Sequence, residues 1–203
     1  MKNRAVLVSF LVCTLGMCYA VAQSVDAGTM DAYGGVSFIY PRAKNYILGA
    51  DYKAKAPMFF LGVDYGLSEQ FTFGIQFTKS YFHSDVITKD PTNPGTVLST
   101  QAIDLSMTGF YGVGKWFVPL KIKNMQPYVS LQPQFFVYSY KYIITSAQTG
   151  QSGDPYHGSS AKVYLGAYAG TRYSFSNRLS AFGELGVGGW SVLNVGASYQ
   201  FKK

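Results

Sequence analysis

Charged residues are scarce in this sequence, and their scarcity limits what the chain can be. The 203-residue chain has 17 basic and 10 acidic residues, which make up 13% of it, whereas an average soluble domain has about 25%. That is too little charge to cover the surface of an ordinary soluble protein. Aromatic residues (17%) and glycine (22 residues) are abundant instead, a mixture that favours strands and tight turns over helices. A helical bundle, a disordered chain and an ordinary α/β enzyme are therefore disfavoured.

Long apolar runs are also missing. After the first two dozen residues no run of about 18 apolar residues occurs, so no transmembrane helix is expected in the body of the chain. The N-terminus has the pattern of a secretory signal peptide, with Lys2 and Arg4 before an apolar stretch and Ala20-Val21-Ala22 as a small-x-small cleavage site. We expect residues 1–22 to be the signal and cleavage to follow Ala22, which leaves residues 23–203 as one mature domain.

Cysteine is absent from this expected mature chain, since Cys13 and Cys18 both lie in the signal segment. Disulfides and thiol chemistry are therefore excluded from it. The two histidines form no cluster with ligand spacing, so neither a metal site nor a cofactor is expected. The basic residues are scattered and form no aromatic-basic motif, which argues against nucleic acid as a partner.

What the chain does contain is segments of alternating polarity separated by turn signals. In the clearest, from Phe71 to Phe77, apolar residues at odd positions alternate with threonine, glycine and glutamine. Because a strand points successive side chains to opposite faces, each such segment has an apolar and a polar face. One segment changes phase near Phe136, which either a β-bulge or a strand that runs beyond the membrane would explain. Eight strands are predicted in this way, at 29–40, 55–66, 71–77, 101–116, 127–144, 161–175, 179–187 and 193–201.

The connections between these segments alternate in length. Residues 66–70 and 176–178 have the composition of tight turns, whereas 41–54, 84–100 and 145–160 have that of long polar loops. Short connections on one rim and long ones on the other are typical of outer-membrane barrels, whose longer loops are extracellular.

Two eight-stranded folds compete at this point. A soluble lipocalin-like barrel has an apolar interior, whereas an outer-membrane barrel has a polar interior and an apolar exterior. The mid-strand charges lie on the polar faces: Asp64, Asp104, Arg172 and Glu184. The apolar faces have only lysines near strand ends, where they can snorkel to the headgroups: Lys79, Lys115 and Lys141. In 101–116 this assignment turns Ile103, Leu105 and Met107 toward lipid. The predicted fold class is therefore all-β, an eight-stranded antiparallel up-and-down transmembrane β-barrel.

Parts of the sequence resemble a known family. Gly112-Val113-Gly114-Lys115-Trp116-Phe117-Val118-Pro119, followed by Gln126-Pro127-Tyr128-Val129, resembles a strand, turn and strand of the bacterial outer-membrane β-barrel domain family, in its small OmpA/OmpX-like porin-family form. Residues 193–201 resemble that family's last strand. The resemblance implies location in the outer membrane, contact with outer-membrane lipid, and assembly by the barrel-insertion machinery, which reads an aromatic C-terminal signal, here Tyr199 and Phe201. It implies no single activity, because the family is functionally mixed.

The main candidate site is an interior charge cluster of Asp64, Arg172 and Glu184. A charge inside a narrow barrel must be paired, because leaving one partner buried and alone costs about 3–5 kcal/mol. We expect Arg172 to bridge Asp64 and Glu184, or at least one of them. The cluster is then either a structural plug or a salt-bridge gate that passes small ions. An open pore is not expected, since eight strands enclose just enough room for side chains. Further filling is expected from Phe60, Phe110, Tyr164 and Phe182.

Three functions follow from these features. The main hypothesis is a structural or surface-interacting barrel without an open pore, which binds an extracellular partner through its outward loops. The second is a narrow, salt-bridge-gated channel for ions or small solutes. The third is a lipid-modifying enzyme, since His157-Gly158-Ser159 has the local spacing of a lipid A deacylase motif. That motif falls in an expected glycine-rich loop with no suitably placed acid, so no enzyme activity is expected.

Overall fold

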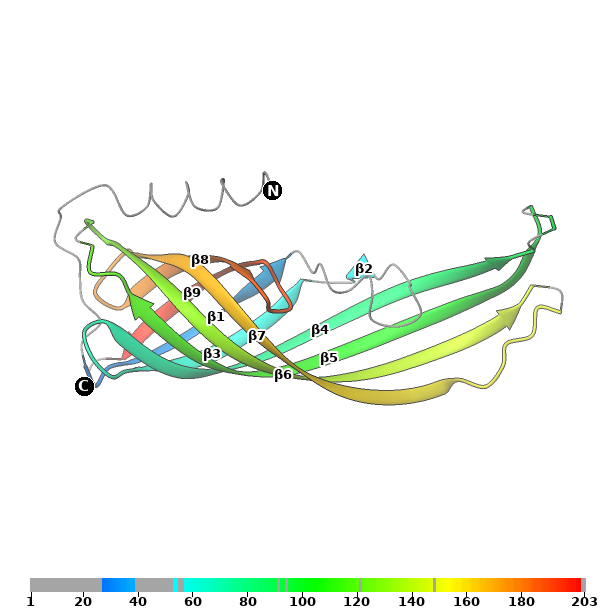
Figure 1. The fold of residues 1–203 in the computed structure, drawn as a ribbon, viewed down its shortest axis with the longest axis horizontal. Coiled ribbons are helices and arrows are strands. Elements are labelled where there is room, and N and C mark those ends of the chain that lie inside the picture. Colours follow the sequence, from blue (N-terminus) through cyan, green and yellow to red (C-terminus); the bar gives the residue numbers. More distant parts are fainter. Residues whose placement is uncertain are drawn as a thin grey trace.

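The computed structural model describes residues 27–38, 53–54, 57–90, 92–93, 95–120, 122–147 and 149–201. Its strands are β1 (Met30–Phe38), β2 (Lys53–Ala54), β3 (Met58–Gly66), β4 (Phe71–Lys89), β5 (Val97–Phe117), β6 (Met125–Ser146), β7 (Tyr156–Ser174), β8 (Leu179–Val187) and β9 (Leu193–Phe201). Eight of them close into an antiparallel ring in the order β1-β3-β4-β5-β6-β7-β8-β9, with β9 back on β1, while β2 pairs with β4 (Figure 1). The predicted eight-stranded antiparallel up-and-down barrel is therefore confirmed. In the described part of the chain, no helix is long and apolar enough to cross a membrane.

The ring strands fall into two length classes. β1, β3, β8 and β9 have nine residues each, about 30 Å of strand, which matches a bilayer core of about 30 Å. β4 to β7 have 19 to 22 residues and continue past the others. Figure 1 shows β4, β5 and β6 running on beyond the ends of β1 and β9. We call this extension, residues 81–89, 97–106, 139–146 and 156–160, the projecting sheet.

Much of the two long loops expected at 84–100 and 145–160 is strand in the structure. The connections themselves are residues 90–96 and 147–155. The expectation was wrong because polarity alone does not indicate a loop: a strand beyond the membrane is also polar on its water-facing side. The loop expected at 41–54 lies outside the described residues, except for β2.

The outward side of the barrel is an apolar belt. Leu61, Ile75 and Val163, for example, are 68%, 68% and 71% exposed. A large contiguous apolar surface in water is a liability for a soluble protein, so this belt is a lipid-facing surface. Exposed aromatic side chains gather at its short-turn end, where an interfacial girdle is expected; they are Tyr65, Phe71, Trp116, Tyr173, Phe175, Tyr199 and Phe201.

The faces of β5 are the reverse of those predicted. Ile103, Leu105 and Met107, expected to contact lipid, point inward and are buried. Phe110, expected inside, lies on the belt with its ring centroid 5.4 Å from that of Phe77. The prediction failed because it put the more apolar face in lipid along the whole strand. The outer half of β5 lies beyond the belt, where apolar side chains pack inward and the polar face meets water.

β6 has no β-bulge near Phe136, so of the two explanations expected from the sequence the bulge is wrong, and the strand that runs beyond the membrane agrees with the structure. Its pairing with β7 keeps one register from Met125 to Tyr142, and even-numbered residues point inward on both sides of Phe136. The inward face changes in content, from Ser130 and the glutamines after it to the aromatic residues from Phe136 onward. The apparent change of phase is therefore a change of environment and not of register.

Candidate functional site in the barrel interior

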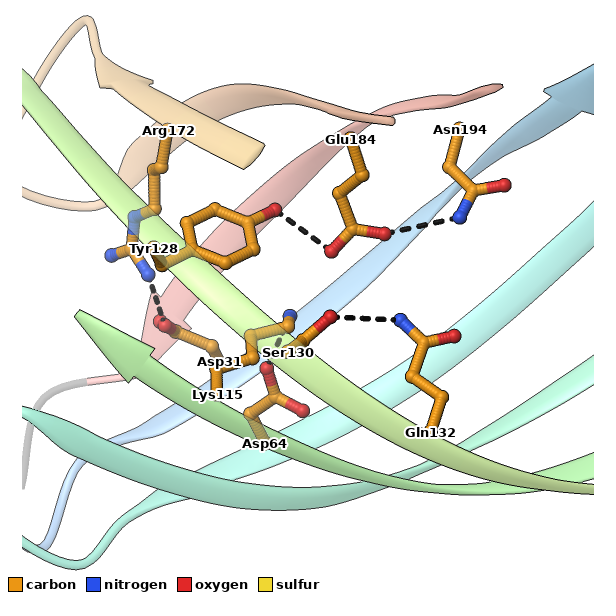
Figure 2. A network of polar contacts seen from close by, with 9 residues as sticks. All are labelled: Asp31, Asp64, Lys115, Tyr128, Ser130, Gln132, Arg172, Glu184 and Asn194. Atoms are coloured by element: carbon orange, nitrogen blue, oxygen red, sulfur yellow. Dashed lines mark hydrogen bonds and ion pairs between the residues drawn. The ribbon is translucent and has the colours of Figure 1, made fainter. Parts of the chain in front are cut away.

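Two buried ion pairs cross the interior near the short-turn end of the barrel (Figure 2). Lys115 Nζ on β5 lies 2.6 Å from Asp64 Oδ2 on β3. Arg172 Nη1 on β7 lies 2.5 Å from Asp31 Oδ2 on β1. All four side chains are at most 10% exposed. Both pairs join strands that are not neighbours in the ring, so they brace the barrel across its interior.

The two carboxylates of these pairs lie side by side. Asp31 and Asp64 are direct partners in the β1–β3 register, and like charges in directly opposite positions destabilise a sheet. Lys115 and Arg172 each neutralise one of them. One oxygen of each carboxylate has no hydrogen-bond partner among the described residues, and in that part of the chain each carboxylate pairs with a single cation. The four charges therefore form one interdependent unit.

Gly74 gives the Lys115–Asp64 pair the room it needs. It lies on β4, between Asp64 on β3 and Val113 on β5 in the register. A Cβ at this position would collide with Asp64 Oδ1 and with the carbonyl oxygen of Val63. Because glycine has no side chain, the carboxylate occupies this space and meets the lysine across the intervening strand.

Aromatic rings surround the ammonium group of Lys115. Its Nζ lies 4.2 Å from the ring centroid of Tyr33 and 5.7 Å from those of Tyr128 and Phe182. A desolvated cation over such a ring is stabilised by roughly 2 kcal/mol. One carboxylate and these rings together hold the ammonium group in place.

Glu184 is held by neutral donors rather than by a cation. The Tyr128 hydroxyl donates to Oε1 at 2.9 Å, and Asn194 Nδ2 donates to Oε2 at 3.1 Å (Figure 2). The Ser191 hydroxyl in turn donates to Asn194 Oδ1 at 2.7 Å. These contacts matter because hydrogen bonds to an ionised acceptor are stronger than neutral ones. Two neutral donors thus serve the carboxylate in place of a cation.

The pairing differs from the one expected from the sequence. Asp64, Arg172 and Glu184 all lie buried in the interior, but the ion pair of Arg172 is with Asp31 and not with Asp64 or Glu184. Arg172 Nε also donates to Ser180 Oγ at 3.3 Å. The expected bridge was wrong because Asp64 already has Lys115, and Glu184 is served by tyrosine and asparagine.

Sequence reasoning missed Asp31 and Lys115. Asp31 could have been predicted as an interior charge, because it is two residues before Tyr33 and therefore shares the face that the sequence pattern assigns to Tyr33. Lys115 could not, because Tyr111 and Val113 share its face and make that face look lipid-directed. In the structure this face points inward, and the lysine is buried.

An aromatic layer lies above the polar cluster. Trp190, from the connection between β8 and β9, is fully buried. Ring centroids lie 5.6 to 6.2 Å from its own for Phe82, Phe136, Tyr138 and Tyr164. Gln134 Oε1 accepts a hydrogen bond from the Trp190 backbone N–H at 3.1 Å, and the Tyr168 hydroxyl donates to the Ser191 carbonyl at 3.1 Å. These bonds hold the connection, and with it the indole, over the interior.

The other sites expected from the sequence are only partly visible. Ala22, the expected cleavage site, lies outside the described residues, so cleavage there stays a prediction. Tyr199 and Phe201 lie on the outer face of β9 with ring centroids 5.1 Å apart. Both are exposed on the lipid-facing belt. Their reading by the insertion machinery also stays a prediction.

The His157-Gly158-Ser159 motif lies in β7 and not in the loop expected for it. The side chains of His157 and Ser159 belong to the outer face of the projecting sheet. In the described part of the chain, no hydrogen bond joins His157 to Ser159. Across the described ranges, no group of three or more histidine, cysteine, aspartate or glutamate side chains is placed to hold a metal ion.

Comparisons with known proteins find likeness in structure alone. No family model and no curated protein matches the sequence. The chain is similar to a major outer membrane protein from Thermus thermophilus, with 14% identity over 86% of this chain and 100% of that chain and a TM-score of 0.54. It also matches the N-terminal β-barrel domain of Pseudomonas aeruginosa OprF, with 12% identity over 88% of this chain and 100% of that chain (TM-score 0.45). A third match is Ail, the attachment invasion locus protein of Yersinia pestis, with 13% identity over 86% of this chain and 99% of that chain (TM-score 0.44).

The Thermus protein shares the fold, and the exposed apolar belt indicates that lipid surrounds the barrel. A closed antiparallel ring with an apolar outside and a charged inside satisfies its backbone within lipid. The outer-membrane localisation expected from the sequence agrees with both observations. The chain is an eight-stranded transmembrane β-barrel of the outer-membrane type.

Proposed function

We propose that the protein is a closed outer-membrane barrel that presents its projecting sheet at the cell surface to an extracellular partner. The observation that carries this proposal is the difference in strand length. Nine residues per strand suffice to span the bilayer, yet β4 to β7 have 19 to 22. The additional residues form a paired, ordered sheet rather than loose loops, and a rigid scaffold is what recognition surfaces require.

The filled interior supports a closed barrel over a gated channel. The cavity left among Asp31, Asp64, Lys115 and Arg172 is about 10 Å³, which is about the space of one water molecule. Above it, Trp190 and its aromatic neighbours form a second barrier. Ion passage would require breaking two buried ion pairs and displacing the indole as well.

Conductance separates the closed barrel from the channel. We expect the purified chain in a planar lipid bilayer to give no current steps under an applied voltage. The Trp190→Ala variant should also stay closed, because the ion pairs below the indole remain. Discrete ion-selective steps in the unmodified protein would contradict the proposal and favour the narrow channel.

Shortening the sheet tests the surface role. In one variant, residues 86–101 and 143–155 are each replaced by Asn-Gly, which favours a two-residue hairpin turn. In the matched control, only the connections 90–96 and 147–155 are replaced. We expect cells that display the natural chain or the control to adhere to an epithelial cell layer, and the shortened variant to lose adhesion at least tenfold. Adhesion no greater than that of cells without the protein would overturn the surface role and leave a structural one.

Catalysis and cofactors are not part of this proposal. The outward His157 and Ser159 are not hydrogen-bonded to each other, and a nucleophile needs a base within reach. For assembly, we propose that Tyr199 and Phe201 are read by the insertion machinery, since both rings are exposed at the end of the last strand. Replacing both by serine should lower the folded amount in the outer membrane. An unchanged amount would contradict that role.

A further inference from the structure

A hollow lies on the outer face of the projecting sheet. Its volume is about 760 Å³. A row of hydroxyl groups crosses it in direct register from strand to strand, with Tyr81 on β4, Ser106 on β5, Ser139 on β6 and Ser159 on β7. Alternate residues of a strand share a face, so these four side chains point to the same side. The row offers several small donors and acceptors on one open surface.

The next row outward contains ionisable groups. His83, Asp104, Lys141 and His157 are direct partners across the same four strands. His83 Nδ1 lies 2.8 Å from Asp104 Oδ1, so that carboxylate already has a partner within the row. Lys141 and His157 lie beside each other at the β6–β7 side, so this end of the hollow has an ammonium group and an imidazole that can donate a hydrogen bond.

The two rows toward the membrane place the hollow at a definite height. Phe77, Phe110, Phe135 and Val163 form one row on the outer face, and all four are exposed on the apolar belt. One row lies between these residues and the hydroxyl row. It begins on β4 with Lys79, whose Nζ donates a hydrogen bond to Thr108 Oγ1 on β5 at 2.7 Å. Successive rows are roughly 7 Å apart along the strands.

This spacing places the hollow outside the hydrocarbon core. The core is about 30 Å thick, and the polar headgroup regions bring the bilayer to about 40–45 Å. The belt ends at the Phe77 row, and from there the hydroxyl row is about 14 Å and the ionisable row about 21 Å along the strands, or about 10 and 15 Å in height at a strand tilt of about 45°. A lipid whose acyl chains contact the Phe77 row therefore reaches the two rows only with a large headgroup. The projecting sheet faces the outer leaflet's surface at this level, with its hollow open toward the lipid side.

We propose that this hollow binds the phosphorylated sugar headgroup of a glycolipid in the outer leaflet. The serine and tyrosine hydroxyls match the hydroxyl groups of a sugar. Lys141 and His157 match a phosphate, to which a lysine binds as a point charge. The acyl chains of the same molecule lie along the Phe77 row. This last contact favours a lipid over a free phosphorylated sugar. The inference rests on the part of the proposed function that puts the projecting sheet on the outer side of the membrane, and not on binding of an extracellular partner.

Gly158 keeps the two strands beneath the hollow close together. It points to the opposite, inner face, where a Cβ would collide with the ring of Tyr140. The tyrosine ring therefore packs flat against the β7 backbone, and its centroid lies 6.3 Å from that of Tyr156 in a stacked arrangement. This packing holds β6 and β7 in the register that brings Lys141 beside His157.

Native mass spectrometry of the detergent-solubilised full protein tests the proposal. The probes are a bis-phosphorylated, acylated glucosamine disaccharide, the same glycolipid without its phosphates, and glucosamine 1-phosphate without acyl chains. We expect one molecule of the first probe to bind at least tenfold more tightly than either of the others. The Lys141→Ala/His157→Ala double variant should lose at least tenfold in affinity for it.

Two further variants distinguish binding in the hollow from nonspecific attraction of the phosphates by surface lysines. Lys89→Ala removes an exposed cation from the same outer face at the far end of β4, and it should bind as the natural chain does. Ser159→Tyr fills the hollow without changing the charge and should weaken binding. Heat-modifiable migration in electrophoresis verifies that each variant folds.

Three results would overturn the proposal. The first is unchanged glycolipid binding in a folded double variant. The second is an equal loss for Lys89→Ala, which would mean diffuse attraction by charge. The third is equal affinity for glucosamine 1-phosphate, which would make the hollow a site for soluble anions rather than for lipid.

Discussion

The barrel and the projecting sheet are built from the same strands, yet they follow opposite rules of polarity. Within the barrel part of β6, Leu131 faces outward and Gln132 inward. In the projecting part, Lys141 faces outward and Tyr140 inward. The register is unbroken between the two parts. Because the backbone is continuous, only the surroundings differ. Lipid stabilises an apolar outside, whereas water stabilises a polar outside and an apolar inside.

The same comparison explains why the interior has two kinds of closure. Where lipid surrounds the outside of the barrel, the inside contains charged and polar side chains, which must form ion pairs and hydrogen bonds with one another. Where water reaches the outside, apolar side chains collect on the inner face, and Phe82, Ile103 and Leu105 are almost completely buried there. The polar part depends on paired charges, and the apolar part depends on packed volume.

The largest expected effect comes from breaking the polar part. Lys115→Met keeps most of the side-chain volume but leaves Asp64 beside Asp31 without its cation. We expect a loss of about 3–5 kcal/mol in the free energy of unfolding, measured by urea titration of the protein in lipid vesicles. The matched control is Lys79→Met, an outward lysine at the edge of the belt, which should cost less than about 1 kcal/mol.

A double variant sharpens this prediction. Lys115→Met combined with Asp64→Asn removes both charges of the pair, so it should recover a large part of the loss. A double variant that is as unstable as the sum of its two single variants would show that the two side chains do not interact, and would contradict the ion pair as the source of stability.

Packed volume in the projecting sheet gives the next effect. Leu105→Ala should cost about 2–5 kcal/mol, as buried leucines do when a cavity is left behind. The loss should be local, with faster amide hydrogen exchange in the projecting parts of β5 and its neighbours and unchanged exchange in β8 and β9. Leu165→Ala, on the lipid-facing belt, is the control and should leave exchange in the projecting sheet unchanged. Equal acceleration in β8 and β9 would show that the two regions unfold as one unit.

The sequence predicts the ring of strands well because alternation is a local property. The strand from Phe71 to Phe77 and the last strand, from Leu193 to Phe201, lie inside lipid for their whole predicted length, and their faces were assigned correctly. Alternation alone does not say where lipid ends. For this reason Leu105 and Phe110 on β5 were placed on the wrong sides.

The interior site was predictable by type but not by pairing. Periodicity predicts which charges point inward. It is right for Asp64, Arg172 and Glu184, and wrong for Asp104, which is exposed on the outer face of β5. The partners depend on which side chains reach across the barrel, and this depends on the tilt and stagger of strands that are distant in the sequence. The pairing also depends on where a side chain is missing. Because Gly74 has none, Asp64 on β3 can reach Lys115 on β5 across β4.

The smallest expected effect is at Gly74, the position whose missing side chain leaves room for the buried carboxylate of Asp64. Gly74→Ala adds one methyl group against Asp64 Oδ1 and the Val63 carbonyl oxygen, so we expect a cost of about 1–3 kcal/mol from overpacking. If part of that cost comes from displacing the carboxylate from Lys115, it should shrink when Asp64→Asn has already removed the charge. A double-mutant cycle of unfolding free energies in vesicles measures this coupling. Fully additive losses would show that the glycine serves the backbone alone, since residues that share a network couple by about 0.5–3 kcal/mol.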